Sequence, residues 1–192
     1  MEFYCLKNPA VWVRWIMSTE IPDQLLQLEA NGGIFAIWKI FQHYGIDLEI
    51  ADLVQLCRHN NEDGSFGIAL AVGLKKLGLE VSFHTDPDPH QHPTEVLCYQ
   101  EAKQLQIPLQ PALSYSALQT CVEQGRFVIV FYDTLEGVGN HSLIYSMDAE
   151  EICFFDSFDP MPAQVFEQQR QAEGICRQAI VIDDRNFVMR YS

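Results

Sequence analysis

The sequence predicts an α+β protein, in which a mainly helical N-terminal half packs on an antiparallel sheet formed by the C-terminal half. Two observations predict this class: apolar residues recur at helical spacing up to residue 78, and the later apolar runs are short, β-branched and aromatic. Helices followed by strands are typical of folds with segregated layers. No linker or low-complexity stretch divides the chain, so we expect one domain over residues 1–192.

Three helices are expected early in the chain, because apolar residues recur there at every third or fourth position. They cover about residues 32–44, 50–58 and 65–78. Gly45 and Gly78 follow the first and the third, and glycine often ends a helix because it accepts the left-handed conformation. Nearer the N-terminus, the alternation of Val11, Val13 and Trp15 favours a short strand.

After residue 78 the pattern changes to short runs that turn residues separate, which is typical of strands. Strands are expected at residues 80–85, 127–132, 141–147, 152–156, 177–182 and 186–191. Two further helices are expected at about 95–105 and 116–124. The links 148–150 and 183–185 have the length of hairpin turns, so the strands that flank each of them should be antiparallel neighbours.

The composition argues against several classes of function. The 192 residues carry a formal net charge of −14 without a basic cluster, so a phosphate backbone would be repelled and nucleic-acid binding is not expected. No run reaches the roughly 20 apolar residues of a membrane span, and no signal peptide is evident, so a cytoplasmic location is expected. The six cysteines are dispersed without a CxxC pair, so a structural zinc site is not indicated. Their even number permits disulfides, but free thiols in a reducing compartment are favoured because no signal peptide is evident. Neither a metal nor a cofactor is indicated, because the pair His90 and His92 has no third ligand nearby.

Four residues suggest a particular chemistry: Gln27, Gly32, His141 and Asp156. Acyl transfer by a cysteine needs a thiolate, a histidine, a group that orients the histidine, and donors for the oxyanion. A helix N-terminus lowers the pKa of a thiol, and position 32 opens the first expected helix. His141 and Asp156 follow on consecutive expected strands. At position 32, however, glycine offers no side chain that could attack a carbonyl carbon.

This set of residues resembles the bacteriocin-processing (double-glycine leader) peptidase family of the papain-like cysteine peptidase clan. That family carries a glutamine, a short spacer, Asp-Cys-Gly, and a helix that ends in Tyr-Tyr-Gly. This chain carries Gln27, then Asn31-Gly32-Gly33, then a helix that ends in His43-Tyr44-Gly45. Two further motifs match in order: a helix that ends in Lys-Leu-Gly78 before a strand, and three strand-like runs, 125–132, 141–145 and 154–156.

The resemblance covers about residues 27–160 and implies a papain-like fold. It also implies that position 32 is the nucleophile position, that His141 is the base with Asp156 as its orienting group, and that Gln27 is the oxyanion donor. This chain departs from the family pattern in several places. The cysteine is Gly32, the preceding aspartate is Asn31, and the residue after His141 is Ser142.

Two alignments and two acids remain open. The spacer from Gln27 to position 32 is one residue shorter than in the family; placing the nucleophile at Gly33 restores that spacer but not the helix. Either alignment gives glycine. The family's Asp-Pro is split here, so both Asp156 and Asp159 are candidates to orient His141.

The resemblance therefore implies a catalytically degenerate peptidase-like domain that holds a peptide or protein segment in the former active-site cleft. A less favoured alternative is an enzyme: a cysteine peptidase or another acyl-transfer hydrolase whose native cysteine has been replaced by glycine, or a site in which His141 and Asp156 activate water. A third alternative is a structural partner protein in which bulky side chains fill the cleft beside Gly32. The sequence does not indicate an oligomeric state.

Overall fold

The computed structural model describes residues 20–134, 137–157 and 159–187. Its helices are α2 (Asp23–Leu26), α3 (Gly32–His43), α4 (Ile50–Leu56), α5 (Gly67–Lys76), α6 (Pro93–Gln104), α7 (Tyr115–Glu123) and α8 (Ala163–Arg170). Its strands are β1 (Glu80–Thr85), β2 (Leu109–Pro111), β3 (Phe127–Asp133), β4 (Gly139–Met147), β5 (Glu151–Phe154), β6 (Met161–Pro162) and β7 (Ala179–Asp183).

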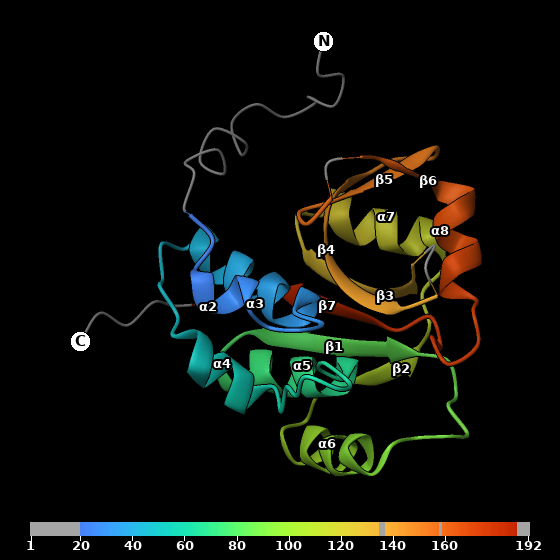
Figure 1. The fold of residues 1–192 in the computed structure, drawn as a ribbon. Coiled ribbons are helices and arrows are strands. Elements are labelled where there is room, and N and C mark those ends of the chain that lie inside the picture. Colours follow the sequence, from blue (N-terminus) through green and yellow to red (C-terminus); the bar gives the residue numbers. More distant parts are fainter. Residues whose placement is uncertain (1–19, 135–136, 158, 188–192) are drawn as a thin grey trace.

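The strands form one sheet of seven strands in the order β2-β1-β7-β3-β4-β5-β6. Every neighbouring pair is antiparallel except β1 and β2, which are parallel. Figure 1 shows α3, α4 and α5 on one side of the sheet, whereas α7 and α8 lie beside β3 to β6. The helices pack against the sheet through two apolar clusters, one on each of its faces.

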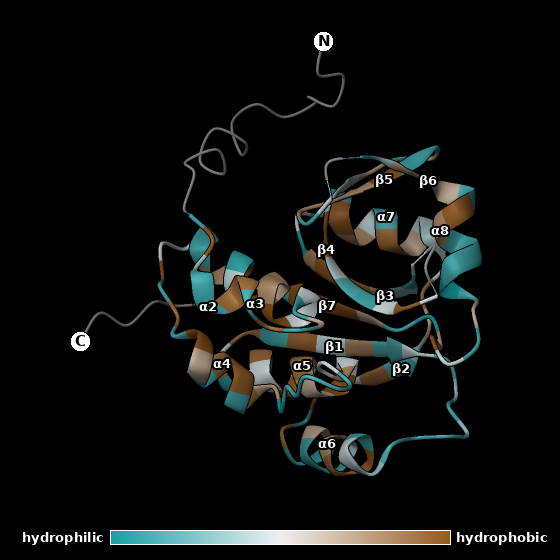
Figure 2. Ribbon diagram, in the orientation of Figure 1, coloured by the Kyte–Doolittle hydropathy of each residue, from teal (hydrophilic) through white to brown (hydrophobic). Residues whose placement is uncertain are grey.

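The alternation of side chains along the strands divides these two clusters. Ile129 of β3 and Ile180 of β7 join the cluster beneath α3 and α5, whereas Val128 and Val181 face α7 and α8. Successive residues of a strand point to opposite faces, so a strand buried on both faces reads as a continuous apolar run. Figure 2 shows this for β7, which is hydrophobic along most of its length.

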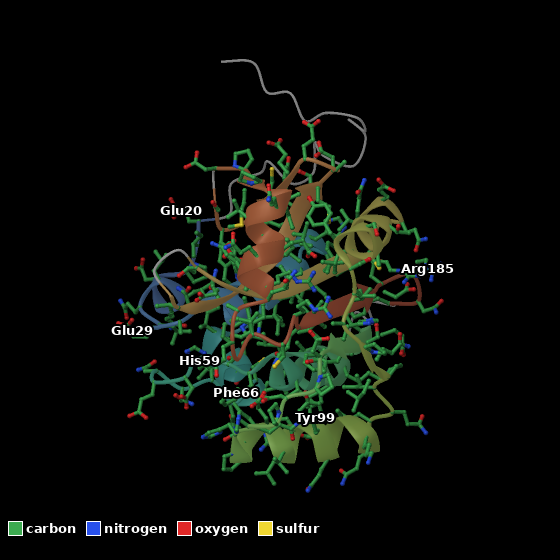
Figure 3. All side chains as sticks on the ribbon, turned by 90° about the vertical axis from the view of Figure 1, so that its right-hand side faces the viewer. Glu20, Glu29, His59, Phe66, Tyr99 and Arg185 are labelled. Atoms are coloured by element: carbon green, nitrogen blue, oxygen red, sulfur yellow. The ribbon has the colours of Figure 1, made fainter. Side chains whose placement is uncertain are left out.

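The ends of the helices are fixed by nearby backbone conformations and capping side chains. Gly45 follows α3 with a φ of 69°, a conformation that costs glycine little and other residues more. At the start of α6, the His92 side chain accepts from the backbone N–H of Thr94, and Glu95 accepts from the backbone N–H of His92, with Pro93 as the first helical residue. Charged side chains such as Glu20, Glu29 and Arg185 lie at the periphery, while apolar side chains fill the space between the layers (Figure 3).

The α+β class expected from the sequence is confirmed, with helices that precede most of the strands. The strand expected at residues 80–85 is β1, whereas the short strand β2 was not expected, and its pairing with β1 is the one parallel pair of the described sheet. The hairpin of β4 and β5 across residues 148–150 is confirmed. The strand expected near Val11 lies outside the described residues, as does most of the run 186–191. Within the described residues, no helix is long and apolar enough to cross a membrane.

Candidate functional site

The helix α3 begins at position 32, as the sequence predicts, but this position is closed. Gly32 is buried, and a Cβ atom added there would lie less than 3.0 Å from both the Asn140 Oδ1 atom and the backbone oxygen of His141. Atoms in real structures do not approach a Cβ so closely. At Gly33, a Cβ would lie 2.7 Å from the Leu70 Cδ1 atom of α5. Neither glycine therefore leaves room for a cysteine side chain in this packing.

The space beside Gly32 is bounded by a network of polar side chains on β3, β4 and the end of β5. The buried Ser142 hydroxyl donates to the Asp156 Oδ2 atom at 2.7 Å, and it also contacts the Tyr132 hydroxyl at 3.2 Å. The Asn140 amide donates to the Ser142 Oγ atom at 3.0 Å and to the Asp156 carboxylate at 3.5 Å. Desolvation by the surrounding protein raises the pKa of Asp156, although the Ser142 and Asn140 donors act in the opposite direction.

His141 points away from this network. Because side chains alternate along a strand, Asn140 and Ser142 share one side of β4, and His141 projects from the other. Its ring stacks on Phe131 with ring centres 4.3 Å apart. The side chain is 9% exposed, and burial lowers its pKa to about 3, so the imidazole is neutral near pH 7.

The structure therefore does not bring the four predicted residues together. The hydrogen bonds of the Asp156 carboxylate go to Ser142 and Asn140, and not to His141. Gln27 is exposed at the end of α2, and Asp159 is exposed after β5. The groups nearest to a Cβ of Gly32 are the Asn140 side chain and the backbone oxygen of His141, whereas the His141 ring lies against Phe131 and close to Gly67.

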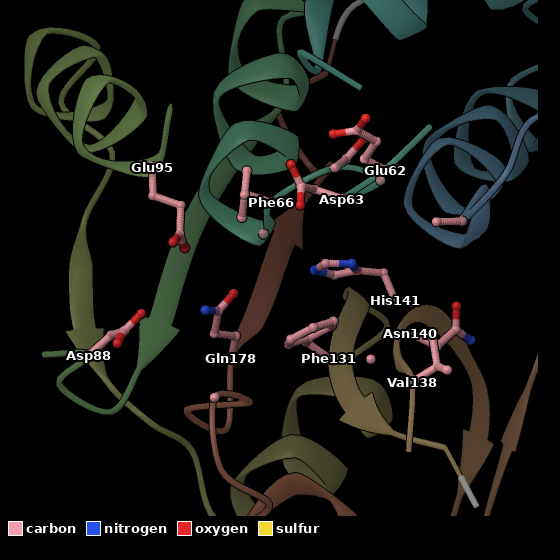
Figure 4. A pocket seen from close by; sticks show the side chains of 16 residues that line it. Glu62, Asp63, Phe66, Asp88, Glu95, Phe131, Val138, Asn140, His141 and Gln178 are labelled. Atoms are coloured by element: carbon pink, nitrogen blue, oxygen red, sulfur yellow. The ribbon is translucent and has the colours of Figure 1, made fainter. Parts of the chain in front are cut away.

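A pocket of about 300 Å³ lies where His141 points (Figure 4). It opens between the α4–α5 connection, the start of α5, the strands β3 and β4, and the segment that precedes β7. Its lining includes Phe66 and Gly67 from the start of α5, Phe131 and His141 from the sheet, and Gln178. Neither Gly32 nor Gly33 belongs to the lining. The accessible site in this part of the fold thus lies next to the expected nucleophile position and not at it.

The floor of the pocket is formed where His141 meets the N-terminus of α5. The His141 Nε2 atom lies 3.3 Å from the point that a Cβ of Gly67 would occupy, and the side-chain oxygen of Gln178 lies closer still. Within the described residues, this Nε2 atom is buried without a hydrogen-bond partner. A buried polar atom without a partner costs free energy, so it marks a place where a bound group could complete the hydrogen bonding.

The rim of the pocket is acidic. Four carboxylates belong to the lining, namely Glu62, Asp63, Asp88 and Glu95. No lysine or arginine belongs to it. In Figure 4, Glu62 and Asp63 lie on one side of the opening, and Asp88 and Glu95 on another. The sequence motifs did not identify these carboxylates, or Asn140 and Gln178, as parts of a site. The carboxylates share one signal, an excess of acidic residues in two segments of the chain, but nothing in the sequence shows that the two segments meet.

None of the described cysteines belongs to the lining of the pocket. Burial raises the pKa of Cys57 to about 12, and it also raises the pKa values of Cys98 and Cys176. Within residues 20–187, the five described cysteines form no disulfide with one another. The described part of the chain also holds no group of three histidine, cysteine or carboxylate side chains arranged for a metal ion. Cys5 lies outside the described residues.

Comparison with known proteins finds no matching protein family and no matching curated protein. Among solved structures, the chain is similar to the peptidase domain of Streptococcus ComA, which is described as a bi-functional ABC transporter involved in a quorum-sensing pathway. The TM-score is 0.47 and the sequence identity is 16%, over 77% of this chain and 86% of that one.

Proposed function

We propose that this protein is a peptidase-like domain without a nucleophile, which binds a peptide or protein segment in the pocket beside His141. The observation that carries the proposal is the contrast between two neighbouring places. Position 32, where the sequence motifs expect the reacting sulfur, is closed by Asn140 and the backbone of β4. The pocket of about 300 Å³ next to it is open and ends on an unpartnered imidazole nitrogen.

The proposal shifts the expected binding site from position 32 to the neighbouring pocket at the start of α5. We expected a segment to bind in the former active-site cleft, directly over position 32. Because that position is closed, we propose that the segment binds in the pocket that His141, Phe131 and Gln178 line. A pocket of this volume is at the small end of ligand sites, so it would take one or two side chains of a longer segment that lies across the surface.

An enzyme is a poorer fit to the same geometry. A peptidase needs a nucleophile near a base, and neither Gly32 nor the buried cysteines provide one. Water activation by His141 would need a partner that supports the protonated ring. Burial disfavours the protonated form of His141, and Asp156 is bonded elsewhere.

The alternative of a structural partner protein has one observation in its favour, namely the filled space beside Gly32. The open pocket argues against a wholly filled site. We further propose that residues 1–192 act as one domain, and that the protein works in the cytoplasm, since its dispersed cysteines suit a reducing compartment.

A peptide array tests the proposal. Hexapeptides blocked at both ends and varied at each position are screened against the full chain, and hits are titrated by fluorescence anisotropy. Val138 lines the pocket and is 58% exposed, so Val138→Trp should obstruct the opening without disturbing the core. Leu26→Trp is the matched control, because Leu26 is 60% exposed and does not line the pocket.

We expect bound hexapeptides to remain intact by mass spectrometry and to lose affinity by about tenfold or more with Val138→Trp only, since each 1.4 kcal/mol of lost contact is a factor of ten. Two results would count against the proposal. One is an array without any hit; the other is an equal effect of Val138→Trp and Leu26→Trp.

A further inference from the structure

We infer that the pocket beside His141 selects a basic side chain, lysine or arginine, within the bound segment. This inference rests on the proposed function, since it names the chemistry of the segment that the same pocket would hold. It is carried by two independent features: the carboxylates of the rim and the unpartnered imidazole of the floor.

Among the described residues, no lysine or arginine forms an ion pair with the carboxylates of the rim. The ion pairs among the described residues involve other acids, and none includes Glu62, Asp63, Asp88 or Glu95. Part of their hydrogen-bonding capacity is used locally: Glu95 caps α6, and Asp88 accepts from the backbone N–H of His90. Glu62 and Asp63 are exposed, with their carboxylates near the opening (Figure 4). A cation at the opening would meet several negative charges and no positive side chain.

At the other side of the rim, the buried Glu95 and the half-buried Asp88 repel one another. Burial raises the pKa of Glu95, and the charge of Asp88 acts in the same direction. A positive group placed between the loops would remove this repulsion. An anionic side chain would add to it, so the electrostatics of the rim separate basic from acidic segments.

The floor of the pocket supplies a hydrogen-bond acceptor of the right kind. A neutral imidazole that carries its proton on Nδ1 has an acceptor at Nε2. This atom is unpartnered and aimed into the pocket, where the N–H groups of an ammonium or a guanidinium could donate to it. The side-chain oxygen of Gln178 lies beside the same point and is a second acceptor. Phe131 and Phe66 offer apolar and aromatic surface for the aliphatic part of a lysine or for the plane of a guanidinium.

The N-terminus of α5 sets the orientation of the segment. Its first N–H groups lack helical acceptors, and its dipole is positive at this end, so a backbone carbonyl of the segment is favoured next to Gly67. The cation is favoured on the other sides, toward the carboxylates. Glycine at position 67 lets the side chains of Gln178 and His141 lie against this end of the helix, because a Cβ there would clash with the Gln178 side-chain oxygen.

The test uses four series of blocked hexapeptides that differ at one fixed position, which is lysine, arginine, glutamine or glutamate. Each series is titrated by fluorescence anisotropy against the full chain at about 50 and 300 mM NaCl, a range over which screening changes strongly. The Glu62→Gln, Asp63→Asn double variant removes two charges of the rim. The Asp47→Asn, Glu123→Gln double variant removes the same charge from exposed residues outside the pocket.

We expect the lysine or the arginine series to bind about tenfold more tightly than the glutamine series at low salt, and the glutamate series to bind most weakly. The rim variant should reduce this preference by about threefold to tenfold, and the control variant should leave it unchanged. Equal binding of the lysine, arginine and glutamine series would overturn the inference while the proposed function stands. Equal effects of the two double variants would also overturn it, because the net charge of −14 would then explain the preference. Binding by none of the four series would count against the proposed function itself.

Discussion

Substitution of Gly32 by alanine should destabilise this protein, although alanine is the better helix former. The added Cβ would lie less than 3.0 Å from two atoms, Asn140 Oδ1 and the backbone oxygen of His141. The Asn140 side chain can rotate away at the cost of its bonds to Ser142 and Asp156, but the backbone of β4 can move only with the sheet.

The magnitude follows from two opposing effects. Overpacking of a tight site costs about 1–3 kcal/mol, and replacing glycine by alanine inside a helix gains up to about 1 kcal/mol. The gain is smaller at the first helical residue, so the free energy of unfolding should fall by about 1–2 kcal/mol. For a chain of 192 residues, this corresponds to a melting temperature lower by about 2–8 °C.

Urea denaturation followed by circular dichroism measures the effect, with the double variant Gly32→Ala, Asn140→Ala as the companion. Once the Asn140 side chain is absent, only the contact with the His141 oxygen remains, so the penalty for adding the Cβ should be smaller but still present. A Gly32→Ala variant as stable as the natural protein, or more stable, would refute the reasoning, because position 32 would then be open.

Three further predictions concern the reactivity of a thiol at position 32, the polar network of Ser142 and the pH dependence of stability. Gly32→Cys should give no thiol that iodoacetamide labels faster than an ordinary exposed cysteine at pH 6, since the pocket does not reach position 32; fast labelling would mean that the cleft is still built. Ser142→Ala should lower the free energy of unfolding by about 1–3 kcal/mol, because buried Ser142 bonds both Asp156 and Tyr132; an unchanged urea midpoint would contradict this network. Burial holds the folded-state pKa of His141 below its ordinary value. Above about pH 6.5 the ring is neutral in both the folded and the unfolded protein and does not affect stability; as pH falls toward 3, protonation of the unfolded state lowers the free energy of unfolding. Relative to His141→Gln, the natural protein should therefore lose up to about 1.4 kcal/mol per pH unit in this range, and parallel pH profiles of the two proteins would contradict the burial of the ring.

Most of the secondary structure could be predicted because its signals are local. The apolar spacing of residues 34–41 and Gly45 define α3, and the alternation of residues 80–85 defines β1 with the bounds that the structure shows. The helix α8 carries no such pattern. Its buried residues include Arg170, which donates to the backbone oxygens of Leu113 and Arg177, so tertiary contacts rather than periodicity hold this helix in place. The short strands β2 and β6 also depend on their partners.

The candidate site was harder to predict, because it depends on contacts between segments far apart in the chain. The sequence places His141 on an expected strand, but it does not show which residues of the helices this strand meets. In the structure the Asn140 side chain and the backbone oxygen of His141 lie against Gly32, and the His141 ring joins a pocket built from segments far apart in the chain. The pairing of the acidic loop at Glu62 with that at Asp88 is likewise a property of the tertiary fold. The start of α3 at position 32 could be predicted from the sequence, whereas the closure of this position by β4 could not.

The central claim, that the pocket beside His141 and not position 32 binds the segment, is tested most directly by NMR. The histidine rings are labelled with ¹⁵N, the His141 signals are assigned by their loss in His141→Gln, and the protein is titrated with the tightest hexapeptide of the array. We predict that the Nε2 signal of His141 shifts on binding, with a Kd equal to that from anisotropy, since this atom gains a partner. An unchanged His141 signal at saturating hexapeptide would contradict the claim and would place binding elsewhere on the protein.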